Sequence, residues 1–268
     1  MRRFISISLL VMAYVLFSSH ELFLKTDNYF MQPNSSAELY LFNGTFDKSE
    51  NVITRDRISK AMIVGSEYER NIPDSAYYDK DNSTYLEFET GLSSTYTAGI
   101  STLPKMIELD ANAFNNYLEH EGLVDTIEER QKEGSSKSGV REKYSKHVKN
   151  LFQVGDVRTQ AYGVIFNFPI EFIPMTNPYD ATVGDSLRFK LLRNGKPLPN
   201  HIVHFSTSSP GIDAHDNENS TRTNEAGIMS MTPTSAGNWY IATIHMEKSG
   251  QKDVDYESNW ATLTFGVR

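Results

Sequence analysis

The stretch that decides the fold is Ala261-Thr-Leu-Thr-Phe-Gly-Val267, in which small or apolar residues alternate with Thr262 and Thr264. Successive side chains of a β-strand point to opposite faces of the sheet, so this alternation is typical of a strand with one apolar face. An apolar face of this length needs a second layer to cover it. The end of the chain therefore predicts a layered β-structure.

The same pattern recurs upstream of this strand. Residues 187–191 alternate apolar with basic side chains, and the dipeptide Asn194-Gly195 is typical of a hairpin turn. Residues 202–205 and 239–246 are further short apolar stretches. Several short strands at this spacing predict a C-terminal β-sandwich of immunoglobulin-like or transthyretin-like type over residues 173–268.

The first part of the chain is also predicted to be rich in β-structure. Residues 37–42 form a compact apolar stretch, and residues 85–89 alternate polar with apolar side chains. Zero cysteines in the whole chain exclude disulfide bonds, so burial of apolar side chains must supply the stability. We expect an N-terminal β-rich domain over residues 20–172.

A helical insert is predicted between about residues 110 and 153. Asp110 suits a helix N-cap, and the residues Phe114, Tyr117 and Leu118 have the spacing of one helical face. A second amphipathic helix is predicted further on because apolar residues recur at three- to four-residue spacing, at Val140, Tyr144, Val148 and Leu151.

The N-terminus has the order of a secretory signal. Two arginines precede an apolar run over residues 4–17, and small residues follow it. This order predicts a cleavable signal peptide over residues 1–19, with His20 as the mature N-terminus. The run is shorter than the ~20 residues of a membrane span, although an uncleaved membrane anchor is the alternative. We expect a periplasmic or otherwise extracytoplasmic protein.

Composition and motifs exclude several classes of function. The net charge of −8 argues against nucleic acid as a partner, because its binding needs a basic surface. The sequence has no G-x-S-x-G motif, no phosphate-binding P-loop and no G-x-G-x-x-G motif. We therefore expect a protein that is not an enzyme; an exported hydrolase is the weakest of the hypotheses.

The candidate metal ligands are histidines. As the first residue of the mature chain, His20 would offer an α-amine and an imidazole to one ion, a donor set that suits Ni(II), Cu(II) and Zn(II). His204 and His245 lie in predicted strands and are the expected partners of His20. Asp213-Ala-His-Asp216 holds three further donors, but its polar surroundings favour a solvated loop.

Several segments resemble one bacterial family of exported proteins. The segments His20-Glu-Leu-Phe-Leu-Lys25, Ile173-Pro-Met-Thr-Asn-Pro178 and Glu257-Ser-Asn-Trp-Ala-Thr-Leu-Thr-Phe265 carry the resemblance. That family consists of domains of unknown function related to the periplasmic component of nickel and cobalt uptake transporters. The resemblance implies a β-rich fold, a periplasmic location and the handling of a transition metal.

Two hypotheses follow. The first is an exported protein that binds a divalent transition metal, nickel or cobalt in the first place and copper or zinc otherwise, and passes it to an inner- or outer-membrane transporter. The second is a non-catalytic envelope or surface module that binds another protein and no metal. Histidines that converge in space would favour the first.

Overall fold

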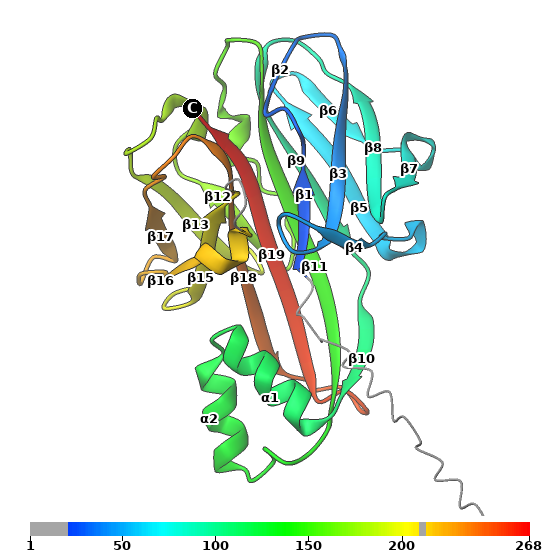
Figure 1. Cartoon of the computed structure of the whole chain (residues 1–268), viewed down its shortest axis with the longest axis vertical. Coiled ribbons are helices and arrows are strands. Elements are labelled where there is room, and N and C mark those ends of the chain that lie inside the picture. Colours follow the sequence, from blue (N-terminus) through cyan, green and yellow to red (C-terminus); the bar gives the residue numbers. More distant parts are fainter. Residues whose placement is uncertain (1–20, 209–212) are drawn as a thin grey trace, which may run out of the picture.

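The computed structural model describes residues 21–208 and 213–268, and the described chain is mainly β, as the sequence predicts. The strands form three sheets of ten, five and four strands. Two long strands run side by side along most of the molecule, and a helical hairpin lies at one end (Figure 1).

The central sheet contains strands from both predicted domains. Its order is β16-β15-β18-β19-β11-β9-β5-β6, with β10 and β2 also paired to β11. The bounds are β2 (Phe30–Met31), β5 (Ile58–Gly65), β6 (Tyr68–Asn71), β9 (Ser94–Thr102), β10 (Lys105–Leu109), β11 (Val140–Val154), β15 (Ile202–Thr207), β16 (Asn219–Arg222), β18 (Gly237–Lys248) and β19 (Tyr256–Val267). Because β11 pairs in parallel with β19, hydrogen bonds cross the predicted boundary at residue 172/173.

Strand β11 corrects the prediction of a second helix over residues 140–151. The strand is buried on both faces over residues 146–154, so its sequence shows no strand alternation. The helical spacing of its apolar residues is accidental, because buried polar residues such as Lys149 and Asn150 occupy the positions between them. The actual second helix, α2 (Val124–Lys132), comes earlier in the chain.

The two smaller sheets cover opposite faces of the central sheet. One consists of β1 (Glu21–Lys25), β3 (Ser36–Gly44), β4 (Ser49–Asn51), β7 (Tyr77–Lys80) and β8 (Ser83–Glu89). The other consists of β12 (Ile170–Pro174), β13 (Leu187–Arg193), β14 (Lys196–Pro197) and β17 (Ile228–Met231). The predicted hairpin turn is confirmed, because Asn194 and Gly195 have φ of 50° and 75° between β13 and β14.

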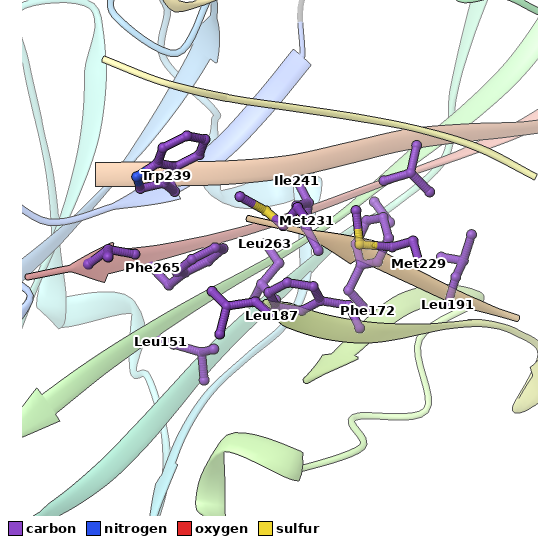
Figure 2. Close-up of a cluster of buried hydrophobic side chains, with 14 of the residues drawn as sticks. Leu151, Phe172, Leu187, Leu191, Met229, Met231, Trp239, Ile241, Leu263 and Phe265 are labelled. Carbon is purple, nitrogen blue, oxygen red and sulfur yellow. The ribbon is translucent and has the colours of Figure 1, made fainter. Parts of the chain in front are cut away.

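The core of the C-terminal sandwich lies between β12, β13 and β17 on one side and β18 and β19 on the other. Figure 2 shows Phe265, Leu263 and Ile241 of the central sheet facing Leu187 and Phe172 of the smaller sheet. All of these side chains are buried. Leu263 and Phe265 therefore use the apolar face that the sequence of the last strand predicts.

The helical hairpin packs on the end of the long strands. Asp110 caps α1 (Ala111–His120) by accepting a hydrogen bond from the backbone N–H of Ala113 at 2.8 Å, as predicted. Phe114 and Leu118 of α1 are buried against Trp260 of β19. This packing fixes the C-terminal end of α1, where His120 lies.

Strand β1 is held on the central sheet by side chains of that sheet. Thr262 donates a hydrogen bond to the backbone carbonyl of Leu22 at 2.7 Å. Asn150 donates to the carbonyl of Leu24 at 3.2 Å. These threonine and asparagine side chains occupy the face of β19 and β11 opposite the sandwich core. They fix the start of β1, and with it Glu21, relative to the central sheet.

Candidate functional site

A pocket of about 320 Å³ lies where β1, α1, β15 and β18 meet. Six separate segments of the sequence contribute to its lining. The lining residues are Glu21, Gly44, Thr45, Phe46, Asn116, Tyr117, His120, Glu121, His204, His215, Glu218 and Tyr240. The pocket thus collects three of the seven histidines of the chain and three carboxylates.

Glu218 pairs closely with His204 in the pocket. The Nδ1 atom of His204, on β15, lies 2.9 Å from Oε2 of Glu218. The Tyr240 hydroxyl, on β18, donates a hydrogen bond to the other carboxylate oxygen at 2.6 Å. Atom Nε2 of His204 is buried and has no hydrogen-bond partner among the described residues. A buried ring nitrogen without a partner costs free energy unless a ligand or water uses it.

His215 is positioned by a short 3-10 helix, η5 (Ala214–Asn217). Asp213 caps this helix by accepting a hydrogen bond from the backbone N–H of His215 at 2.9 Å. Ala214 is completely buried, so the helix is fixed against the protein on one side. His215 Nδ1 lies 3.9 Å from Oε1 of Glu218. One carboxylate therefore faces two histidines.

His120 completes the histidine group from the end of α1. Its ring centroid lies 4.9 Å from that of His215. His120 Nε2 lies 3.9 Å from Oε1 of Glu121. The side chain of His120 is 48% exposed and that of His215 is 44% exposed, whereas that of His204 is 15% exposed. The pocket therefore has an accessible edge formed by two histidines and a deeper histidine behind them.

The pocket electrostatics follow from burial and from the carboxylates. Burial, and secondarily the neighbouring His215, lowers the pKa of His120. The hydrogen bond to Glu218 raises the pKa of His215. Burial acts to lower the pKa of His204, but its hydrogen bond and charge interaction with Glu218 outweigh burial, and the pKa is raised.

The pKa values of two carboxyl groups in the pocket are shifted in opposite directions. Burial, followed by the charges of Glu121 and Glu218, raises the pKa of Glu21 well above its usual range. Burial acts to raise the pKa of Glu218 as well, but hydrogen bonds from His204, His215 and Tyr240 prevail and lower it. A neighbouring like charge favours the protonated form of a carboxyl group, as it does for Glu21.

The structure separates the predicted ligands: His204 lies with His120 and His215 in the pocket, whereas the ring of His245 lies 5.7 Å from that of His201. His204 lies in the pocket, whereas His20 lies outside the described residues. The pairing of His204 with Ala242 places His204 on the same face of the sheet as Tyr240. His245 lies on the opposite face because side chains alternate along β18, so it cannot share an ion with His204.

The sequence analysis missed the role of His120, His215, Glu218 and Tyr240. Residues 213–216 are predicted to form a solvated loop. In the structure they belong to η5, where Ala214 is buried, and the following Glu218 lines the pocket. The one local indication of a site is Glu218, which follows His215 by three residues and can therefore lie close to it. No pattern in the sequence relates that segment to α1, which is about 95 residues away.

The described residues contain no three histidine, aspartate or glutamate side chains already arranged to hold a metal ion. Three histidines line the pocket without forming such a group. Within residues 21–208 and 213–268, no helix has the length and apolar character needed to cross a bilayer.

The fold and the pocket define a layered β-protein with a cavity lined by histidines and glutamates. The chain belongs to the family described as domain of unknown function DUF4198, whose model matches residues 18–247. No curated protein matches the sequence.

Solved structures with a similar arrangement of strands have little sequence identity to the chain. The D0-D1 domain of intimin is 11% identical, with 91% of this chain and 97% of that chain covered and a TM-score of 0.21. A Salmonella alpha-2-macroglobulin reacted with methylamine is 9% identical over 91% of this chain and 15% of that chain, with a TM-score of 0.24. A DUF4785 family protein from Legionella pneumophila is 9% identical over 81% of this chain and 50% of that chain, with a TM-score of 0.25. Scores of this size carry no argument about function.

Proposed function

We propose that the protein is exported, loses residues 1–19, and binds a divalent transition-metal ion in the histidine pocket. One observation carries the proposal: His120, His204 and His215, from three separate segments, line one pocket together with Glu218. Imidazole nitrogens and carboxylates are the ligands that Ni(II), Co(II), Cu(II) and Zn(II) take in proteins. Glu21 and Glu121 add further carboxyl groups to the same space.

The proposal assigns His20 as a further ligand. His20 immediately precedes Glu21, and Glu21 lines the pocket. Cleavage after Ser19 would give His20 a free α-amine next to its imidazole, so one residue would supply two nitrogen donors. An α-amine has a pKa of about 7.7–8.0, and a metal ion therefore displaces a proton from it near neutral pH.

The proposed cellular role follows from the family that the sequence resembles. The resemblance of the sequence to domains related to nickel and cobalt uptake supports a periplasmic carrier that passes its ion to a membrane transporter. The partly exposed His120 and His215 form the accessible edge of the pocket, through which an ion could be transferred. This role makes the ion the cargo of the protein rather than a permanent cofactor.

The test uses protein exported in its native host and purified from the cell envelope. Intact mass gives the first residue of the mature chain. Calorimetric titration with Ni(II), Co(II), Cu(II) and Zn(II) gives stoichiometry and affinity. We expect a mass that starts at His20 and one ion per chain. We expect the variants His204→Ala and His20→Ala to bind more than about 100-fold more weakly, beyond the usual loss when a residue that only supports a ligand is changed.

His245→Ala is the matched control, because His245 lies on β18, one of the strands of the pocket, but on the opposite face of the sheet. It should bind like the wild type. Loss of binding in His245→Ala with unchanged binding in His204→Ala would show that the pocket is not the site. Wild-type protein that binds no ion more tightly than an unrelated histidine-containing protein would refute the function and leave an envelope interaction module, whose partner cross-linking would identify.

A further inference from the structure

A second cavity, of about 460 Å³, lies where the segment after β1 passes the first half of β3. None of its lining residues lines the histidine pocket. The lining combines two carboxylates, two side-chain amides and several hydroxyl groups, and it includes no lysine, arginine or histidine. Such a lining offers hydrogen-bond acceptors and donors without positive charge, so it disfavours an anionic ligand.

Hydrogen bonds from side chains hold the backbone around this cavity in place. The Thr90 hydroxyl donates to the carbonyl of Gln32 at 2.7 Å, and the Ser35 hydroxyl donates to the same carbonyl at 2.8 Å. The side-chain oxygen of Asn28 accepts the backbone N–H of Phe30 at 2.9 Å. Asn28 and Gln32 are exposed, so their side-chain amides can still reach a ligand. A cavity with a fixed backbone loses less conformational freedom when a ligand binds.

A row of three tyrosines continues the cavity across the five-stranded sheet. Tyr40 lines the cavity, Tyr85 lies opposite Tyr40 on β8, and Tyr78 lies opposite Tyr85 on β7. The ring centroids are 5.4 Å apart for the first pair and 5.1 Å apart for the second. Leu39 and Leu86, at the adjacent positions, are buried in the core. Because side chains alternate along a strand, the tyrosine row lies on the face of the sheet away from that core.

Each carboxylate of the cavity accepts a hydrogen bond from one tyrosine of the row. The Tyr40 hydroxyl donates to Asp27 at 2.7 Å, and the Tyr78 hydroxyl donates to Glu38 at 2.5 Å. A carboxylate has about four acceptor positions. Asp27 and Glu38 are exposed, so each keeps positions for the hydroxyl groups of a ligand.

We propose that this cavity and the tyrosine row bind a neutral oligosaccharide. A sugar ring has an apolar C–H face that packs on an aromatic ring, and its hydroxyl groups both donate and accept hydrogen bonds. The tyrosines provide the first kind of contact, and the carboxylates and amides provide the second. A cage for an ammonium group needs aromatic faces around one cation, whereas Tyr78 and Tyr85 are stacked on each other at 13°. A row of rings instead suits successive units of a sugar chain.

The experiment screens protein purified from the cell envelope on an array of neutral oligosaccharides and then titrates the best binders by calorimetry. We expect saturable binding of at least one of them. Tyr85→Ala should bind about tenfold or more weakly, because it removes the central ring of the row. Asp27→Ala should bind about 10- to 100-fold more weakly, because it removes a charged acceptor. Tyr85→Phe keeps the ring and is the matched control, which should bind like the wild type.

Two further measurements keep the test independent of damage to the fold. Thermal unfolding shows whether each variant is folded. Saturation-transfer NMR on the wild type should show that ring C–H protons of the sugar contact the protein. The affinity should stay constant between about 0.05 M and about 0.5 M salt, because screening weakens only interactions between charges.

The outcomes that overturn the inference are distinct from those that concern the metal ion. Absence of binding to every neutral oligosaccharide of the array would overturn it, as would wild-type affinity in folded Tyr85→Ala. Binding of spermidine or a basic peptide that weakens with salt, without binding of sugars, would make the cavity a cation site instead. Each result can be obtained whether or not the histidine pocket binds a metal, since the two cavities share no lining residue.

Discussion

Replacement of Lys149 by methionine should destabilise the whole protein. Lys149 lies on β11, and its side chain is 1% exposed. Its ammonium lies 3.1 Å from Oε2 of Glu171, whose side chain is 2% exposed, and donates hydrogen bonds to the carbonyls of Val164 and Phe172. Glu171 precedes Phe172 in β12, so this ion pair ties the first strand of the C-terminal sheet to the central sheet.

The magnitude follows from the charge that the substitution leaves behind. Methionine fills similar space but provides no positive charge, so Glu171 stays buried without its counter-ion. Removal of one partner of a buried ion pair costs about 3–5 kcal/mol. Two backbone N–H groups, of Phe166 and Phe168, still donate to Glu171 at 3.0 Å and 3.2 Å. These donors place the expected loss near the lower limit, about 3 kcal/mol.

Urea unfolding followed by circular dichroism gives the free energy of unfolding, and calorimetry gives the Tm. For a chain of this size, each kcal/mol changes the Tm by about 2–4 °C, so Lys149→Met should lower it by roughly 6–12 °C. Arg141→Met is the control. Arg141 lies 3.2 Å from Asp253 in an exposed pair, and its loss should cost less than about 1 kcal/mol.

The double variant Lys149→Met with Glu171→Leu tests the reason for the loss. If an unpaired buried carboxylate causes the destabilisation, removal of that carboxylate should restore part of the stability. A decrease in Tm below about 2 °C in Lys149→Met, or a double variant less stable than the sum of the two single changes, would refute the reasoning.

Three further predictions concern single side chains. Burial lowers the pKa of His147 from 6.5 to about 4, so the unfolded chain binds a proton more readily. His147 should therefore account for about 3 kcal/mol of the stability lost as the pH falls from about 6.5 to about 4. Urea unfolding of His147→Gln should show a fall smaller by that amount, and the remainder comes from other buried histidines such as His201, whose pKa burial also lowers to about 4. Thr262→Val removes the donor to the carbonyl of Leu22; calorimetry should show a loss of about 1–3 kcal/mol, and an unchanged Tm would contradict the proposed attachment of β1. Gly99→Ala would place a Cβ 2.6 Å from the ring of Phe166. Urea unfolding should show a loss of about 1–3 kcal/mol in the free energy of unfolding, whereas wild-type stability would show that the ring can move aside.

The structure explains why the first helix of the predicted insert is correct and the second, over residues 140–151, is wrong. The N-cap Asp110 and the buried face of α1 have local signals that the chain carries within ten residues. Strand β11 has no such signal, because its neighbours cover both faces and its buried polar residues bond to partners that are distant in the sequence. Lys149 pairs with Glu171, and Asn150 bonds to Thr264 of β19 at 2.6 Å. The spacing of residues along the sequence contains no information about partners that come from distant segments of the folded chain.

The sequence by itself determined the class of fold, because the alternation in Ala261-Thr-Leu-Thr-Phe-Gly-Val267 reports a strand with one covered face. It also identified His204 as a residue worth testing. Only the tertiary structure decided which residues accompany it. The cross-strand register separates His245 from His204, and the docking of α1 and η5 on the central sheet brings His120 and His215 into one pocket. The physical reason is that a ligand set is a property of packing between segments, and the spacing of residues along one chain does not encode which segments meet.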